Sequence, residues 1–223
     1  MKLLPNIQSR FKKAFTLVEL LLVMAIISIL VGLATVGLEG AFAAGGLTQS
    51  MESVNSDLGL ARQAAAVENV EFEVRFLKFP DPDSGRPEKR FRGFQIVKRK
   101  AVTDPEDDEY SRPGTDDFEA ATIPITPIRY FMKGVILIEE PEKSTLLTDI
   151  SRTGDENITL PDSTETADYA YFRFTPDGGT DLDRNKRWFL TFANENDLEK
   201  GKLYNYATLQ IEPDTGKAIW FRP

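Results

Sequence analysis

The sequence contains no cysteine and no histidine among its 223 residues. Without cysteine there is no disulfide framework, no thiolate nucleophile and no zinc–thiolate site. Without histidine the commonest general base and metal ligand is missing, which excludes serine–histidine triads and most transition-metal sites. An enzyme with this composition would have to use carboxylates, lysine, serine, threonine or tyrosine. We expect a protein that is not an enzyme and that needs no cofactor.

Positive charge is also scarce, since the formal net charge is −8. Phosphate binding needs a basic face, so nucleic acid is not expected as a partner. The basic residues that precede the first apolar run, with no acidic residue among them, are Lys2, Arg10, Lys12 and Lys13. Basic residues flanking an apolar segment tend to stay on the cytoplasmic side, so this pattern places the N-terminus in the cytoplasm and the rest outside it.

Proline is absent between Pro5 and Pro80, which permits one long helix over residues 15–67. Residues 20–38 are almost all apolar, and about 20 such residues span a bilayer as a helix. We therefore expect residues 15–38 to be embedded in a membrane. The second part of the helix, residues 47–67, is amphipathic. Its apolar side chains recur every three or four residues at Leu47, Met51, Val54, Leu58, Ala61 and Ala65.

Residues 14–20 read Ala-Phe-Thr-Leu-Val-Glu-Leu and place one carboxylate, Glu19, near the start of the apolar run. A charge at bilayer depth costs about 2.5–3.5 kcal/mol on insertion scales, so it is usually paired and functional. This string resembles the N-terminus of type IV pilins and of type II secretion pseudopilins. The resemblance implies that residues 1–14 are a leader, that a prepilin peptidase cuts between Ala14 and Phe15, and that the new amine is methylated. Glu19 then occupies the fifth mature position.

The resemblance also implies a role for Glu19 in filament assembly. Its carboxylate would pair with the amine of Phe15 in its own or a neighbouring subunit, because an unpaired charge in lipid is costly. A second interpretation needs no partner, because an acid at the N-terminus of a helix complements the helix dipole.

After residue 67 the pattern becomes that of strands. Residues 70–79 alternate apolar and charged side chains, which predicts a half-buried strand with its charged residues in solvent. Further strand signals lie at residues 91–97, 135–138, 170–174, 188–192, 206–211 and 218–221, and loops are expected at 104–119 and 139–166. The predicted fold class is α+β, with a long N-terminal helix packed on an antiparallel β domain at residues 68–223, in a pilin-like arrangement.

Later segments extend the resemblance to minor, H-type pseudopilins. Residues 58–65 resemble their helix end, residues 172–178 (Phe-Arg-Phe-Thr-Pro-Asp-Gly) their late strand and turn, and residues 211–219 their closing turn. The combination is also similar to the Verru_Chthon cassette protein D group. It implies a minor pilin or pseudopilin subunit of a type II secretion or type IV pilus-like filament.

Such a subunit would be a single-pass inner-membrane protein with a periplasmic β domain until it enters the filament. Its partners would be the prepilin peptidase, other pilin or pseudopilin subunits, the inner-membrane assembly platform and the membrane itself.

Two other interpretations of the N-terminal segment are open. Residues 41–43 (Ala-Phe-Ala) fit a signal-peptidase site, and cleavage after Ala43 would release an exported β-rich binding module. The alternative is an uncleaved membrane anchor. The length of the apolar run and the position of Glu19 disfavour a signal peptide, and an uncleaved anchor leaves the Phe-Thr-Leu-Val-Glu string unexplained.

A glycine-rich turn in the β domain carries three carboxylates, at Asp177, Asp181 and Asp183. Oxygen ligands at such a spacing are able to hold calcium, but the EF-hand spacing and its terminal glutamate are absent. A solvated turn between strands accounts for the same residues. We therefore expect no metal site, with calcium as a weak alternative.

Overall fold

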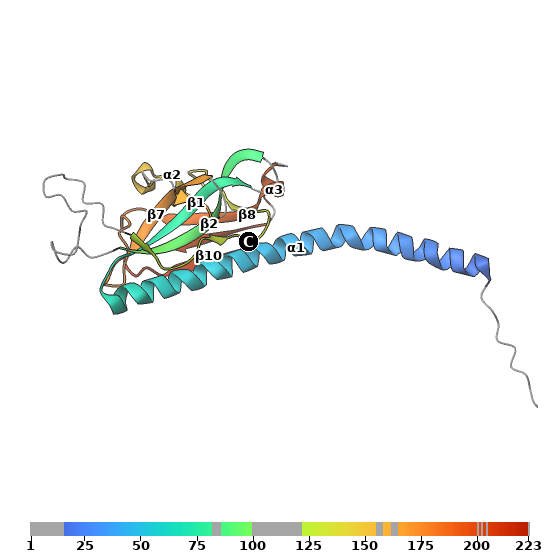
Figure 1. Cartoon of the computed structure of the whole chain (residues 1–223), viewed down its shortest axis with the longest axis horizontal. Coiled ribbons are helices and arrows are strands. Elements are labelled where there is room, and N and C mark those ends of the chain that lie inside the picture. Colours follow the sequence, from blue (N-terminus) through green and yellow to red (C-terminus); the bar gives the residue numbers. More distant parts are fainter. Residues whose placement is uncertain are drawn as a thin grey trace, which may run out of the picture. The chain divides into compact units, whose positions relative to one another are not determined.

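One long helix dominates the structure (Figure 1), a computed structural model that describes residues 16–81, 86–99, 122–154, 158–161, 165–199, 201, 203 and 205–222. This helix, α1, runs from Leu17 to Glu68. The chain divides into two compact units, Met1–Phe42 and Ala43–Pro223, so α1 contributes to both. The α+β class expected from the sequence is confirmed.

In the first unit, every described side chain of α1 is exposed. The large apolar side chains between Leu17 and Val31 have exposed fractions from 46% at Val23 to 73% at Leu17. Leucine and alanine, which favour helix, make up much of this segment. Within the described residues, no helix is both long and apolar enough to cross a membrane. Residues 17–32 thus present a largely apolar surface around the helix over about four turns.

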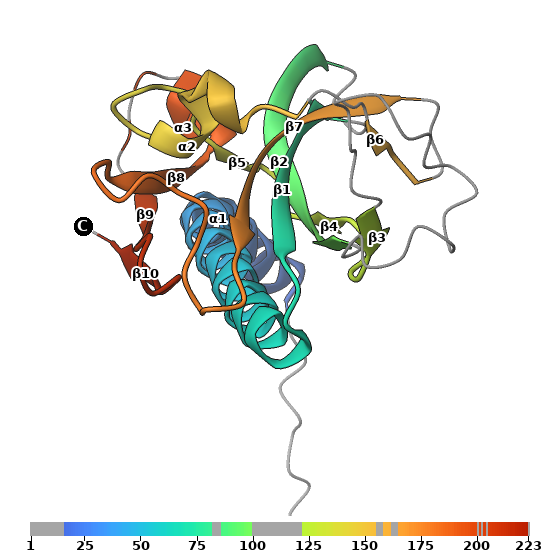
Figure 2. The ribbon, with the colours of Figure 1, turned by 90° about the vertical axis from the view of Figure 1, so that its left-hand side faces the viewer.

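The second unit is an antiparallel sheet with the end of α1 against it (Figure 2). The described strands are β1 (Phe72–Asp81), β2 (Arg86–Arg99), β3 (Thr122–Pro124), β4 (Arg129–Tyr130), β5 (Val135–Leu137), β6 (Ile158–Thr159), β7 (Thr166–Phe174), β8 (Trp188–Asn194), β9 (Tyr206–Ile211) and β10 (Ala218–Phe221). Their order is β10-β9-β8-β5-β2-β1-β7-β6, with β3 and β4 paired to β2. The hairpin expected from the first two strands is β1 with β2, where Val74 lies opposite Ile96.

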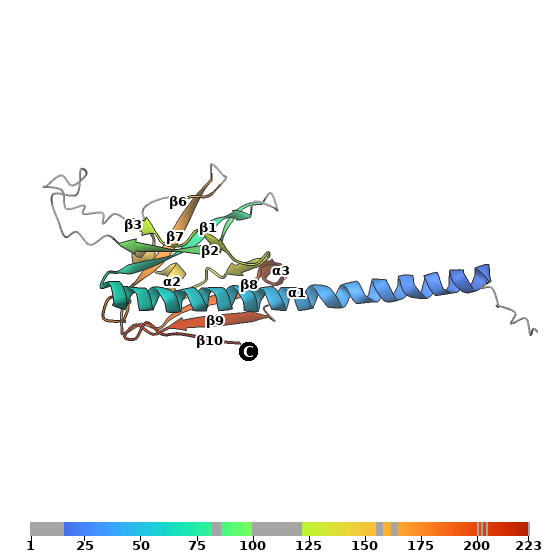
Figure 3. The same cartoon turned by 60° about the horizontal axis from the view of Figure 1, so that its bottom comes forward.

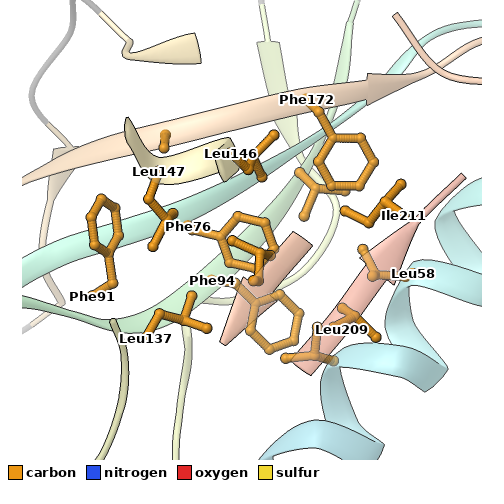
Figure 4. Close-up of a cluster of buried hydrophobic side chains, with 14 of the residues drawn as sticks. Leu58, Phe76, Phe91, Phe94, Leu137, Leu146, Leu147, Phe172, Leu209 and Ile211 are labelled. Carbon is orange, nitrogen blue, oxygen red and sulfur yellow. The ribbon is translucent and has the colours of Figure 1, made fainter. Parts of the chain in front are cut away.

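The core lies between α1 and one face of the sheet. The predicted apolar stripe of α1 is buried, with exposed fractions of 4% or less at Leu47, Met51, Val54, Leu58, Ala61 and Ala65. Figure 4 shows Leu58 beside Leu209 and Ile211 of β9, with Phe76 and Phe94 from β1 and β2 in the same cluster. Burying one such side chain stabilises the fold by about 1.5–3 kcal/mol. The stripe therefore fixes the second half of α1 to the sheet, along which it runs in Figure 3.

Strand β1 is buried on both faces, so the prediction of a half-buried strand with solvated charges is wrong. Glu73 and Arg75 are only 3% and 7% exposed. Their face of the sheet carries a second apolar cluster that includes Leu77 and Phe79. The opposite face of β1 packs in the main cluster with the apolar stripe of α1, so other parts of the domain cover both of its faces.

The segment 139–166, expected to be a polar loop, contributes secondary structure and core. It contains the short helix α2 (Thr145–Thr148), the 3₁₀ helix η1 (Ile150–Arg152) and strand β6. Leu146 and Leu147 of α2 are buried in the main cluster. These elements have few residues, so they lack the periodicity by which sequence patterns reveal structure. The acidic stretch 104–119 lies outside the described residues.

Asp57 of α1 is a charged residue that is only 6% exposed. Its carboxylate lies 2.7 Å from the guanidinium of Arg129 in β4. A buried carboxylate is stabilised by a nearby cation, so this ion pair adds a polar contact between α1 and the sheet.

We expect Leu58→Ala to lower the free energy of unfolding by about 2–5 kcal/mol, because it opens a cavity where α1 meets the sheet. Thermal unfolding of the full-length chain in detergent micelles measures this as a fall in Tm of about 5–15 °C. Leu60→Ala is the matched control, since Leu60 is 61% exposed on the same helix. It should change stability by less than about 0.5 kcal/mol. Equal losses in the two variants would contradict the assigned face of α1.

Candidate functional site

The start of α1 is closed by a reciprocal set of hydrogen bonds between Thr16 and Glu19. The Thr16 amide and hydroxyl donate to Oε2 of Glu19 over 2.9 and 2.8 Å. The Glu19 amide donates to Oγ1 of Thr16 over 3.2 Å. This is a capping box, in which the threonine and the acid three residues later satisfy donors that the helix leaves unpaired. The carboxylate on which the assembly hypothesis depends is therefore oriented by its own chain.

Glu19 is the one charged residue of the described segment 16–32. It lies in the first turn of α1, where the helix dipole favours a negative charge. Its neighbours Leu17, Val18 and Leu20 are apolar and at least 61% exposed. The site is thus a single carboxylate at the head of an exposed apolar helix.

The predicted processing site, Ala14 and Phe15, lies outside the described residues. The pairing of Glu19 with an amine at Phe15 stays a prediction for the same reason. The structure instead supports the other interpretation of Glu19, in which the carboxylate stabilises the N-terminus of its own helix. Capping and pairing use the same carboxylate, which has two oxygen atoms and several lone pairs for donors.

Polar contacts also fix the second half of α1 to the β domain. The Ser50 hydroxyl accepts a hydrogen bond of 2.9 Å from the amide of Met132. The guanidinium of Arg222, after β10, donates to the hydroxyl of Thr48 over 2.8 Å. These bonds join α1 to segments more than 80 residues away in the sequence. The helix therefore has a defined rotation against the sheet.

The three aspartates of the glycine-rich turn are not brought together as a metal site. Asp181 forms an ion pair of 2.7 Å with Arg152, whereas Asp183 accepts a hydrogen bond of 2.9 Å from the amide of Asn185. Asp177 accepts from the hydroxyl of Thr175 in its own turn. Among the described residues, no group of three or more acidic, cysteine or histidine side chains is arranged to hold a metal ion. The calcium alternative gains no support from this geometry.

Two features of the structure were not predicted from the sequence. The capping box has a recognisable signature, a threonine followed three residues later by glutamate ahead of an apolar run, and it was available in residues 16–19. The buried charges of β1, Glu73 and Arg75, had no such signature. Alternation of apolar and charged residues normally indicates solvent on the charged face, and only the packing of other segments overturns it.

Comparison with known proteins identifies the N-terminus alone. Residues 9–35 match the family model described as the prokaryotic N-terminal methylation motif. No curated protein and no solved structure matches the chain. The chain thus carries a prepilin-type leader segment, which implies processing by a prepilin peptidase and assembly with pilin-like subunits. The matched segment begins in the leader and ends within α1, so it includes the capping box.

We expect Thr16→Ala to weaken the first turn of α1 by about 0.5–2 kcal/mol, because it removes the N-cap. Hydrogen exchange of the Glu19 amide, followed by NMR on the full-length chain in micelles, should accelerate about 2- to 30-fold. Thr16→Ser keeps the hydroxyl and should exchange like the wild type. An unchanged rate in Thr16→Ala would show that the capping box does not form.

Proposed function

We propose that this chain is a minor pilin or pseudopilin subunit of a type II secretion or type IV pilus-like filament. The leader, residues 1–14, is removed between Ala14 and Phe15, and the new amine is methylated. The subunit waits in the inner membrane as a single-pass protein with its β domain in the periplasm. It then enters the filament through the first part of α1.

The observation that carries this proposal is that the residues matching the methylation motif include the exposed apolar start of α1. Residues 9–35 match the motif, and the described part of this segment leaves its large apolar side chains at least 46% exposed. Large exposed apolar patches mark contact with a membrane or with other proteins. A subunit that passes from membrane to filament needs such a surface in both places.

The proposed role of Glu19 is to pair with the methylated amine of Phe15 in a neighbouring subunit. In an apolar environment neither charge is stable alone, so the pair favours one register between adjacent helices. The capping box supports this role, because it orients the carboxylate at the helix start before any partner arrives. Contacts of that kind reduce the entropy lost on association.

The second candidate is an exported binding module released after Ala43. The observation that favours it is the division of the chain between Phe42 and Ala43, one residue before this signal-peptidase cut. The whole apolar stripe of α1, from Leu47 to Ala65, would remain with the β domain after this cut.

The two candidates predict different N-termini for the mature protein. Mass spectrometry of the N-terminal peptide from the membrane fraction of the native host should find a peptide that begins at Phe15 and carries one extra methyl group. Unprocessed chain with Met1, or a peptide that begins at Ala44, would contradict the proposal. The second of these results would establish the exported module.

Two variants of Glu19 distinguish the role of its negative charge from its role in the capping box. Glu19→Ala removes both, whereas Glu19→Gln keeps an acceptor for the capping box and loses the charge. If charge pairing sets the register, the amount of each variant that co-purifies with partner subunits should be at least about tenfold lower than that of the wild type. The reason is that an unpaired amine in an apolar environment costs several kcal/mol. Co-purification with filament subunits from the native host measures this.

Two controls accompany this measurement. The β domain of each variant should keep the wild-type Tm, because Glu19 lies outside the core. The mass of the N-terminal peptide should show that cleavage still occurs. Normal co-assembly of Glu19→Gln would disprove the charge pairing and leave capping as the role of the residue.

A further inference from the structure

A cluster of buried charges lies on the face of the sheet that carries the second apolar cluster. Glu73 of β1 accepts hydrogen bonds from Nε of Arg75 over 2.6 Å and from Nε of Arg173 over 2.8 Å. Arg173 also lies near Asp181, which pairs with Arg152. The side chain of Glu73 is 4% exposed and that of Arg75 8%.

This cluster holds an excess of positive charge. Three guanidinium groups, from Arg75, Arg152 and Arg173, share the two carboxylates of Glu73 and Asp181. Burial would lower the pKa of Arg173, but the hydrogen bond and charge of Glu73 raise it above its ordinary value. Arg173 therefore stays cationic. Among the described residues, this cluster therefore has one guanidinium group more than it has carboxylates.

Arg75 is the member of the cluster that reaches a cavity. The open pocket beside it has a volume of about 540 Å³ and is lined by segments of β1, β2 and β6 and by residues 122–128. Figure 2 shows β3, β4 and β6 together on one side of β1 and β2. Arg75 is the one charged residue among the described residues that line it. The volume lies within the range of about 300–1,000 Å³ that is usual for sites of small ligands.

The guanidinium of Arg75 is held in place but retains donors. Nε bonds to Glu73, Nη2 donates to Thr122 over 3.3 Å, and the group stacks 4.7 Å above the ring of Tyr169. No described residue accepts a hydrogen bond from Nη1. A guanidinium fixed by a carboxylate and a ring has little freedom to lose when it binds an anion.

The remainder of the pocket combines apolar and polar surface, with apolar residues the more numerous. Ile128, Ile158 and Leu160 contribute side chains, and several prolines and threonines complete the lining. Gln95 is 9% exposed, and its amide is already engaged with the carbonyl of Thr126. The pocket therefore combines one oriented cation with aliphatic walls.

From this geometry we infer that the pocket binds a carboxylate attached to an aliphatic body, with Arg75 as its charge partner. The carboxylate supplies the negative charge that the cluster lacks, through charge-assisted hydrogen bonds. The aliphatic body gains stability from the apolar walls. A polypeptide C-terminus that ends in an aliphatic residue and a free aliphatic acid share this chemistry.

The test uses three probes that differ in one group each. N-acetyl-leucine carries an amide, an isobutyl group and a carboxylate; N-acetyl-leucinamide has lost the charge; 4-methylpentanoate has lost the acetylated amine. Each is titrated into the full-length chain in micelles, and the methyl groups of the isoleucines are followed by NMR. The signals of Ile128 and Ile158 should shift, and that of Ile150, which is 89% exposed and outside the pocket, should not.

Binding of N-acetyl-leucine alone supports the site and assigns it to polypeptide C-termini. Binding of both carboxylates supports the site and assigns it to aliphatic acids in general. The inference is overturned if neither carboxylate binds. It is also overturned if N-acetyl-leucinamide binds as tightly as N-acetyl-leucine.

Three variants locate the site. Arg75→Gln should weaken binding at least about tenfold, since it removes a charge-assisted contact. Thr159→Trp narrows the pocket from an exposed position and should weaken binding without touching the charge cluster. Arg99→Gln is the matched control, because Arg99 is a neighbouring arginine that pairs with Glu71 and does not line the pocket. Wild-type affinity in Thr159→Trp, or an equal loss in Arg99→Gln, overturns the inference even if Arg75→Gln does not fold.

Discussion

The burial of one face of α1 against the sheet is the interaction on which the rest of this structure depends. The stripe from Leu47 to Ala65 fills the centre of the main core, where it meets aromatic side chains of β1, β2 and β7. Apolar burial is the dominant favourable term in folding, and here a single helix supplies one side of it. The same helix extends from this anchored half into a segment whose described side chains are all exposed. A firmly held base for an exposed apolar extension suits a subunit that associates through that extension.

At the head of that extension, one carboxylate serves two physical needs. Glu19 closes the first turn of α1 with Thr16, which satisfies backbone donors that have no other partner in an apolar environment. In the proposed function, the same group also pairs with the amine of a processed neighbour. The two uses do not compete, because capping aligns the carboxylate at the helix end and leaves it charged. In the β domain the buried acid Glu73 pairs with two arginines, Arg75 and Arg173, and Arg75 also borders a cavity.

Several parts of the fold were predictable because their patterns are periodic. The stripe of α1 repeats every three or four residues, and the strands at residues 188–192 and 206–211 are rich in aromatic and β-branched residues. All are found where expected. The short elements α2, η1 and β6 were not predictable, because two to four residues carry no period. In the candidate site, the position of Glu19 was clear from the sequence. Its bonds with Thr16 were recognisable from the spacing alone but were overlooked.

By itself the sequence determined the α+β class, the length of the first helix, its buried stripe and the prepilin-type N-terminus, because each depends on local spacing along the chain. Only the tertiary structure decided the fate of charges such as Glu73, Arg75 and Asp57. Their local patterns indicate solvent, yet segments distant in the sequence cover them and supply their partners. Burial of a polar group is a property of what packs over it, and that depends on contacts between residues that the sequence places far apart.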